Sequence, residues 1–224
     1  ITLYVASLYT CIQHTLGIQA CDYFLKKRSI KFLEHNEMLI EMIRFCLKEN
    51  IFLFDGEYYH QLTGTAMGTC FAPSYAGLFM GWWEEQVAWS TDLDQYTSRI
   101  VTWIRYIDDL FLIWDGPESI ALEYIEALNN NMCNLHLTHT ISDECIDFLD
   151  VRVKVVGDHL ETNLFRKSTA GNSVLHFTSH HPRNLVESIP FGELIRTKRA
   201  CSNDVIFLQA ARETLFRFKQ RKYP

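Results

Sequence analysis

The sequence contains no apolar run of about eighteen residues, the length that a membrane-spanning helix requires. The nearest stretch, residues 71–83, is interrupted by Pro73 and Gly77 and ends at Glu84. No signal peptide, internal repeat or low-complexity tract is visible. The chain opens on Ile1 without an initiator methionine, and this opening resembles the middle of a strand. We therefore expect a non-membrane fragment of a longer protein, with one large domain and a small addition.

Paired cysteines are also lacking. The seven cysteines form no C-x-x-C pair and follow no spacing pattern, which favours reduced thiols in an intracellular protein. His176, His180 and His181 could be considered as zinc ligands. Because no matching second pair of ligands exists, polar loop histidines are the favoured interpretation.

Lys and Arg residues are scarce in the first three quarters of the sequence and frequent in the last quarter. Net charge is −6, and the first 165 residues hold ten Lys/Arg against twenty-three Asp/Glu. Residues 166–224 hold eleven Lys/Arg against four Asp/Glu. A basic end beside an acidic body is expected where one part contacts a polyanion, although a solvated helix face would look the same. We divide the chain into residues 1–165 and a basic part, residues 166–224.

Hydrophobic periodicity predicts helices and strands that are interleaved without a regular β-α-β order. Asp55-Gly56 between two apolar runs predicts a β-hairpin. Helices are predicted over residues 16–27, 34–48, 70–89 and 117–130, and after Pro190. Strands are predicted over residues 1–6, 100–106, 110–114, 135–141, 146–155 and 159–166. This pattern indicates an α+β fold in which helices back an antiparallel sheet, followed by a small helical part.

Two adjacent carboxylates, Asp108 and Asp109, interrupt an apolar stretch that runs from Tyr106 to Trp114. Placing two like charges there is costly unless a cation neutralises them. A tight hairpin would put both at its apex, and Mg²⁺ would supply the counter-charge through oxygen ligands. The alternative is an ordinary turn between two core strands, for which Asp-Asp is an unusual pair.

A glycine-containing loop precedes the helix predicted from residue 70. Gly64 and Gly68 flank a short segment that leads into this helix. Glycine lets a backbone approach a ligand closely, and a helix start offers free N–H groups to phosphates. Taken alone, an ordinary turn into a helix is the more frequent explanation of such a pattern.

The order of these segments resembles motifs B and C of reverse transcriptases. Residues 7–14, with Ser7-Leu8-Tyr9-Thr10, resemble motif A of Penelope-like elements, and Phe148-Leu149-Asp150-Val151 resembles a signature downstream in the same family. Similar signatures run through residues 162–167, 179–182 and 189–202, so the resemblance covers almost the whole chain. It implies the palm of a telomerase-related right-hand polymerase over residues 1–165, with a helical thumb over residues 166–224.

The resemblance implies an RNA-directed DNA polymerase that uses two Mg²⁺ ions, an RNA template, a DNA primer and deoxynucleoside triphosphates. Asp108 and Asp109 would be the catalytic metal ligands. The residues that would line the nucleotide are Tyr9, Gln61, Gly64, Ala66, Met67 and Gly68. The residues that would contact nucleic acid are Arg166, Lys167, Arg196, Lys198 and Arg199. An intracellular location that could include the nucleus is also expected.

The sequence departs from this family at one decisive position. Where the motif carries its aspartate, this chain has Tyr4, whose phenol is neutral at pH 7 and cannot replace a bridging carboxylate. The fingers that precede motif A in the family are absent from this sequence. We therefore expect a reverse transcriptase domain that is inactive, with Mg²⁺ binding weakened or lost.

Two alternatives stay open. A non-catalytic nucleic-acid-binding remnant would keep the basic part without the chemistry. A metal-dependent nuclease using Asp108 and Asp109 would leave the glycine loop and Tyr9 without a role. The family interpretation makes one geometric prediction: Tyr4 should lie beside the Asp108-Asp109 hairpin, although 104 residues separate Tyr4 from Asp108.

Overall fold

The computed structural model describes residues 1–28, 35–167 and 169–224, and it contains two compact units, Ile1–Thr140 and Ile141–Pro224. The predicted boundary between residues 165 and 166 therefore falls inside the second unit. The physical reason is that strand β9 (His159–Leu164) is hydrogen-bonded to the helical part, since the Ser202 amide donates to Thr162 O at 3.0 Å. The two units are described separately below.

The first unit is built on a four-stranded antiparallel sheet in the order β4-β5-β1-β6. Its strands are β1 (Thr2–Val5), β4 (Ile100–Tyr106), β5 (Asp109–Trp114) and β6 (Leu137–Thr140). The strand nearest the start of the sequence thus lies between two strands from more than 100 residues downstream. This long-range pairing determines which side chains meet at the candidate site.

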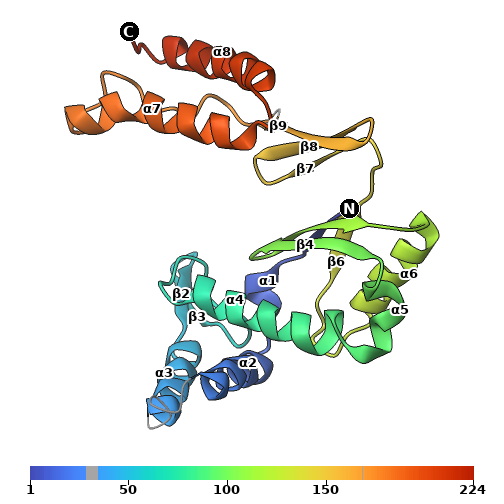
Figure 1. Cartoon of the computed structure of the whole chain (residues 1–224). Coiled ribbons are helices and arrows are strands. Elements are labelled where there is room, and N and C mark those ends of the chain that lie inside the picture. The colour runs from blue at the N-terminus through green and yellow to red at the C-terminus, as the bar shows by residue number, and fades with distance from the viewer. Residues whose placement is uncertain (29–34, 168) are drawn as a thin grey trace. The chain divides into compact units, whose positions relative to one another are not determined.

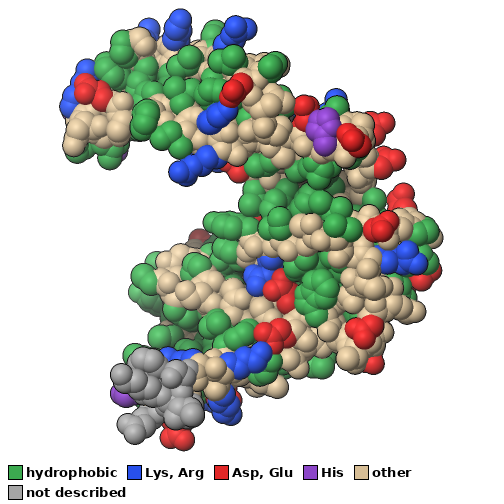
Figure 2. Space-filling model, in the orientation of Figure 1, with side chains coloured by type: hydrophobic (Ala, Val, Ile, Leu, Met, Phe, Trp, Pro, Cys, Tyr) green, Lys and Arg blue, Asp and Glu red, His purple; other side chains and the backbone are tan. Residues whose placement is uncertain are grey.

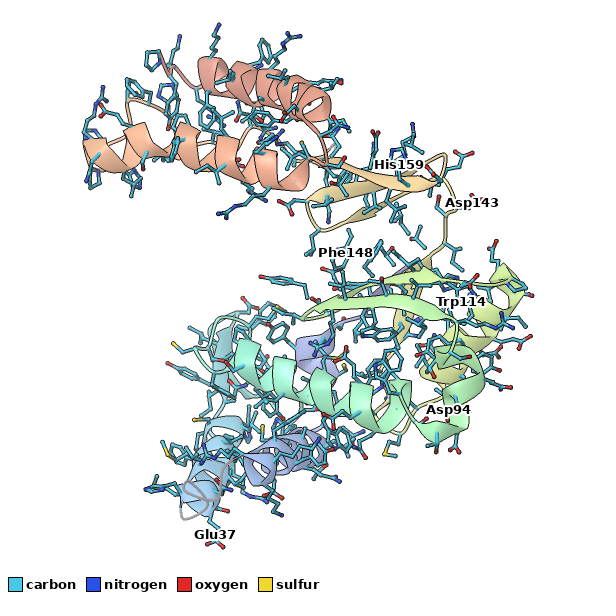
Figure 3. The ribbon with its side chains drawn as sticks, viewed as in Figure 1. Glu37, Asp94, Trp114, Asp143, Phe148 and His159 are labelled. Carbon is cyan, nitrogen blue, oxygen red and sulfur yellow. The ribbon has the colours of Figure 1, made fainter. Side chains whose placement is uncertain are left out.

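One face of this sheet forms the core of the first unit. Leu3, Val5, Leu110 and Leu137 are buried on it. Helices α4 (Ala72–Trp83) and α6 (Glu118–Asn129) lie along the sheet in Figure 1, and the Tyr124 hydroxyl of α6 donates to Ala88 O just after α4. At the end of β5, Trp114 (labelled in Figure 3) stacks on Tyr124 of α6, with ring centroids 5.9 Å apart. The other face of the sheet exposes Tyr4, Ile104 and Tyr106.

The remaining elements of the first unit include α2, which packs against α4. Tyr75 of α4 packs against Gly17 of α2 so closely that a Cβ atom at residue 17 would lie 1.8 Å from the Tyr75 hydroxyl. The hairpin expected at Asp55-Gly56 is confirmed, with both residues at positive φ as a type I′ turn requires. These elements are α1 (Leu8–Cys11), α2 (His14–Lys27), α3 (Asn36–Lys48), β2 (Ile51–Phe54), β3 (Glu57–His60), η2 (Glu84–Ala88), η3 (Thr91–Leu93) and α5 (Asp94–Thr97).

The second unit combines a three-stranded antiparallel sheet, β7-β8-β9, with two helices, α7 (Arg183–Ala200) and α8 (Asp204–Gln220). The single strand predicted over residues 146–155 is wrong, because the chain turns at Leu149, where φ is +53°, and forms β7 (Cys145–Phe148) and β8 (Val151–Val156). The helix predicted after Pro190 begins earlier, at Arg183, and contains Pro190. Val186, Phe218 and Tyr223 form the small core between the helices.

The predicted combination of helices with antiparallel sheets is confirmed in both units. Among the described residues, the helices are either too short or too polar to cross a membrane.

Candidate metal and nucleic-acid sites

The hairpin that joins β4 to β5 carries the two adjacent carboxylates. Tyr106 pairs with Asp109, so the two central turn residues are Ile107 and Asp108. The apex therefore lies one residue earlier than the predicted Asp108-Asp109, and Asp109 is the first residue of β5. Ile107 has φ of +55°, an outlier for a β-branched side chain that costs about 1–3 kcal/mol. Such strain persists only where the surrounding structure enforces it.

Tyr4 lies directly beside this hairpin, as predicted. Tyr4 pairs with Asp109 across the β1–β5 ladder, and the Val5 amide donates to Asp108 O at 2.9 Å. Residues opposite each other in an antiparallel pair project to the same face. Tyr106, Asp109, Tyr4 and Thr138 consequently form one row across the open face of the sheet. Asp109, rather than the turn residue Asp108, is the direct partner of Tyr4.

The donor set at this hairpin is incomplete for a two-metal centre. It consists of two carboxylates, Asp108 and Asp109, and the neutral phenol of Tyr4 where a third carboxylate would be required. Over residues 1–28, 35–167 and 169–224, no group of three or more His, Cys, Asp or Glu side chains is arranged to hold a metal ion. The residues present therefore do not fit a pair of Mg²⁺ ions.

An ion pair beneath the sheet supports the strained turn, and the sequence analysis missed it. Arg105 donates to both carboxylate oxygens of Glu84, at 2.8 and 2.9 Å, and each side chain is only 17% exposed. Trp103 Nε1 donates to the same Glu84 carboxylate at 2.8 Å. Arg105 also donates to the carbonyl oxygen of Ile107 at 3.4 Å. The pair thus links the end of α4 to the turn that presents Asp108.

Local signals for this ion pair existed in the sequence. Arg105 occupies a core-facing position in an alternating strand, since it pairs with the fully buried Leu110. Glu84 ends an apolar helix and begins the π-helical stretch η2, a feature often found at functional sites. A charged residue at a core position predicts a buried partner, but nothing in the sequence identifies that partner.

The glycine loop is bound to the segment that follows β1. Gly64 N–H donates to Ile12 O at 2.9 Å, and Thr65 N–H donates to Tyr9 O at 2.6 Å. A Cβ atom at Gly64 would lie 2.4 Å from Tyr9 O, and φ of Gly64 is +74°. Glycine is therefore required there by both close approach and backbone conformation. The structure brings together Tyr9 and Gly64, which the resemblance assigns to one nucleotide site.

The other predicted nucleotide-lining residues lie along the same loop. Gln61 accepts from Asn50 and donates to Thr63 O, so its amide is used to hold the loop. Ala66 O accepts hydrogen bonds from Thr69, Met67 is 76% exposed, and Gly68 has φ of +96° with open space around its Cα. The loop thus exposes the Met67 side chain and leaves space beside Gly68. A role of these residues in binding nucleotides stays a prediction.

Three of the five predicted nucleic-acid-binding residues are engaged within the second unit. Arg166 donates to the Thr214 hydroxyl at 3.0 Å, and burial lowers the pKa of its guanidinium. Arg196 donates to Asp150 at 2.7 Å, and this hydrogen bond raises the pKa of Arg196. Lys198 forms an ion pair with Asp204. These three contacts join different segments of the second unit, so their first role is structural.

The other basic side chains are available to an external anion. Lys167 and Arg199 are exposed and make no ion pair with any residue that the structure describes. Basic side chains on and after α8, which the sequence analysis did not single out, share this property: they are Arg212, Lys219 and Lys222. In Figure 2, Lys and Arg side chains are interspersed with hydrophobic ones over α7 and α8. By formal charge the second unit is +3, with thirteen Lys/Arg and ten Asp/Glu, whereas the first is −9, with eight and seventeen.

Comparisons with known proteins found a matching family model and a similar solved structure. Residues 173–224 match the family described as the animal helix-turn-helix domain. The fold is similar to that of an apo telomerase from Candida tropicalis truncated from its C-terminal domain, with a TM-score of 0.52 and 11% sequence identity. That similarity covers 71% of this chain and 34% of the telomerase chain. No curated protein sequence matches.

The two findings establish different points. At 11% identity, the telomerase comparison establishes a similar fold, and the chain spans about one third of that structure. The helix-turn-helix match covers both α7 and α8, which together make the helical part of the second unit. The comparisons therefore establish a fold similar to part of the telomerase chain, and a helix-turn-helix match that is confined to the second unit.

Proposed function

We propose that this chain is the palm and thumb portion of a Penelope-like reverse transcriptase whose polymerase centre is inactive. The observation that carries the proposal is the pairing of Tyr4 with Asp109, beside the strained Ile107-Asp108 turn. A random surface turn would place no constraint on a residue more than 100 positions away. The pairing supports assigning Tyr4 to the motif position of the missing aspartate, because a third metal ligand would be needed beside Asp109.

The same geometry explains the expected loss of activity. In active relatives, Mg²⁺ ions activate the primer hydroxyl and stabilise the leaving pyrophosphate. Tyr4 places a bulky neutral phenol next to Asp109, which removes one negative charge and occupies space. Asp108 and Asp109 alone would hold a divalent cation weakly. Thr65 of the Gly64 loop is hydrogen-bonded to Tyr9, so the residues assigned to the nucleotide would stay together although the metal ligands are incomplete.

Primer extension on an RNA template tests this proposal. The purified chain should incorporate no deoxynucleotide above background with Mg²⁺ or with Mn²⁺, while an active reverse transcriptase extends the same primer in parallel. Template-dependent incorporation by the unmodified chain would refute the inactive centre. Cleavage of a plain duplex that depends on Asp108 would instead favour a nuclease.

A second candidate function is sequence-independent nucleic-acid binding by the second unit. The helix-turn-helix match over residues 173–224 and the exposed basic side chains of α8 favour it. This function needs no metal, and it is compatible with the first, because a polymerase thumb also binds duplexes. Binding of an RNA–DNA hybrid without extension would be its expected result.

A further inference from the structure

The β2–β3 hairpin exposes more large apolar side chains than an isolated surface element normally does. Every residue of both strands is exposed, including Ile51, Leu53, Phe54 and Tyr58 at 60% or more. The two strands form a sheet of their own, and no third strand pairs with them among the described residues. A two-stranded hairpin is only marginally stable in water. An exposed apolar surface of this kind marks an interaction site.

Both faces of the hairpin are apolar, which is typical of strands buried on two sides. One face carries Phe52 stacked on Tyr59, with ring centroids 5.6 Å apart, together with Phe54. The other carries Ile51, Leu53 and Tyr58, because side chains alternate along a strand. A partner that covered one face of the hairpin would leave the apolar side chains of the other face exposed to water. The element is therefore suited to become an inner part of a larger sheet.

The direction of the backbone groups identifies the free edge. Gln61 N–H donates to Asn50 O, and the hairpin register then directs the N–H and C=O groups of residues 50, 52 and 54 towards β3. The backbone N–H and C=O groups of Ile51 and Leu53 consequently point outward from the β2 edge. Those of Tyr58 and His60 point outward from the β3 edge.

The β2 edge lacks the devices that protect exposed strand edges. Ile51-Phe52-Leu53-Phe54 contains no charge, no proline and no bulge. The β3 edge, in contrast, carries Glu57, and the His60 side chain is hydrogen-bonded to the backbone of Lys48. Of the two edges of this hairpin, the β2 edge is the one whose outward backbone groups lie within an uncharged apolar strand.

We propose that two copies of this chain dimerise by antiparallel pairing of their β2 edges around a two-fold axis. Ile51 of each copy would exchange hydrogen bonds with Leu53 of the other, and the two Phe52 side chains would face each other on the axis. The result is a four-stranded sheet in the order β3-β2-β2-β3. The pairing is self-complementary, as an isologous interface requires, and the paired strands themselves carry no charge. The Phe52–Tyr59 stacks of both copies would join into one aromatic cluster.

Sedimentation and light scattering across the micromolar range test the dimer on the full chain. The expected mass is twice the 26.2 kDa of one chain. Leu53→Pro removes an outward N–H and leaves the bonds inside the hairpin intact, so it should raise the dimer dissociation constant about tenfold or more. Tyr58→Pro makes the same change on the β3 edge and should leave the dimer unaffected. Far-UV circular dichroism of both variants checks that they fold.

Cross-linking gives a second readout that does not depend on proline. Phe52→Cys, in a chain whose exposed Cys46, Cys70 and Cys145 are changed to serine, should form a covalent dimer on mild oxidation. Tyr59→Cys in the same background lies on the same face but on β3, and it should form no covalent dimer on oxidation. A chain that is monomeric at every concentration would overturn the proposal. So would a dimer that Tyr58→Pro dissociates and Leu53→Pro does not.

Discussion

At the scale of single residues, the positive φ of Ile107 has a measurable cost. Glycine adopts this conformation without strain, although it gives up backbone entropy and the Ile107 side-chain contacts. Ile107→Gly should therefore stabilise the protein by about 1 kcal/mol in urea denaturation. Ile104→Gly, in the extended strand β4 that leads into this turn, should destabilise the protein by about 1 kcal/mol. If both variants lowered the free energy of unfolding by the same amount, Ile107 would not be strained.

Tyr4 provides the second residue-scale prediction. Tyr4→Asp adds a carboxylate opposite Asp109 and should strengthen Mn²⁺ binding at least about tenfold, or about 1.4 kcal/mol. Electron paramagnetic resonance of free Mn²⁺ measures this directly. Thr138→Asp adds the same charge to the same face at about two strand spacings from Asp109, roughly 10 Å, and should have little effect. If both variants bound Mn²⁺ equally, Tyr4 would not occupy a ligand position.

At the scale of elements, the Glu84–Arg105 ion pair connects α4 to the β4–β5 hairpin. Arg105→Met leaves the Glu84 carboxylate with limited access to water and should cost about 3 kcal/mol of unfolding free energy. Glu84→Gln combined with Arg105→Met should cost less than the two single changes added together. The coupling free energy from such a double-mutant cycle should be about 1–3 kcal/mol. If the losses of unfolding free energy from the two single changes were additive, Glu84 and Arg105 would not be energetically coupled.

Sequence alone predicted those elements that are fixed by local chemistry. The turn at Asp55-Gly56 was found because both residues tolerate positive φ, whereas the turn at Leu149 was missed because leucine gives no such signal. The place of Tyr4 beside the Asp108-Asp109 hairpin came from the family resemblance, since no local property of β1 indicates its neighbours. The partners of Arg166, Arg196 and Lys198 could not be foreseen, because each contact joins different elements.

At the scale of the whole molecule, the opposite charges of the two units predict where nucleic acid binds. The double variant Arg212→Ser/Lys219→Ser should weaken binding of an RNA–DNA hybrid and reduce the slope of log affinity against log salt by about 2. Fluorescence anisotropy over a salt series measures both. Lys26→Ser/Lys48→Ser removes the same charge from the first unit and should change neither quantity. If the two double variants weakened binding equally, overall charge rather than α8 would govern affinity.

The central place of β1 in its sheet has a consequence for the order in which the protein can fold during synthesis. A ribosome makes β1 long before β5 and β6, its two hydrogen-bonding neighbours, and at about 5–20 residues per second the delay is on the order of ten seconds. Helices α2 and α4 and the β2–β3 hairpin need only nearby residues and can form in that interval. The apolar segment Thr2–Val5 therefore stays unpaired and exposed to solvent, where chaperones can bind it, until residue 140 has left the exit tunnel.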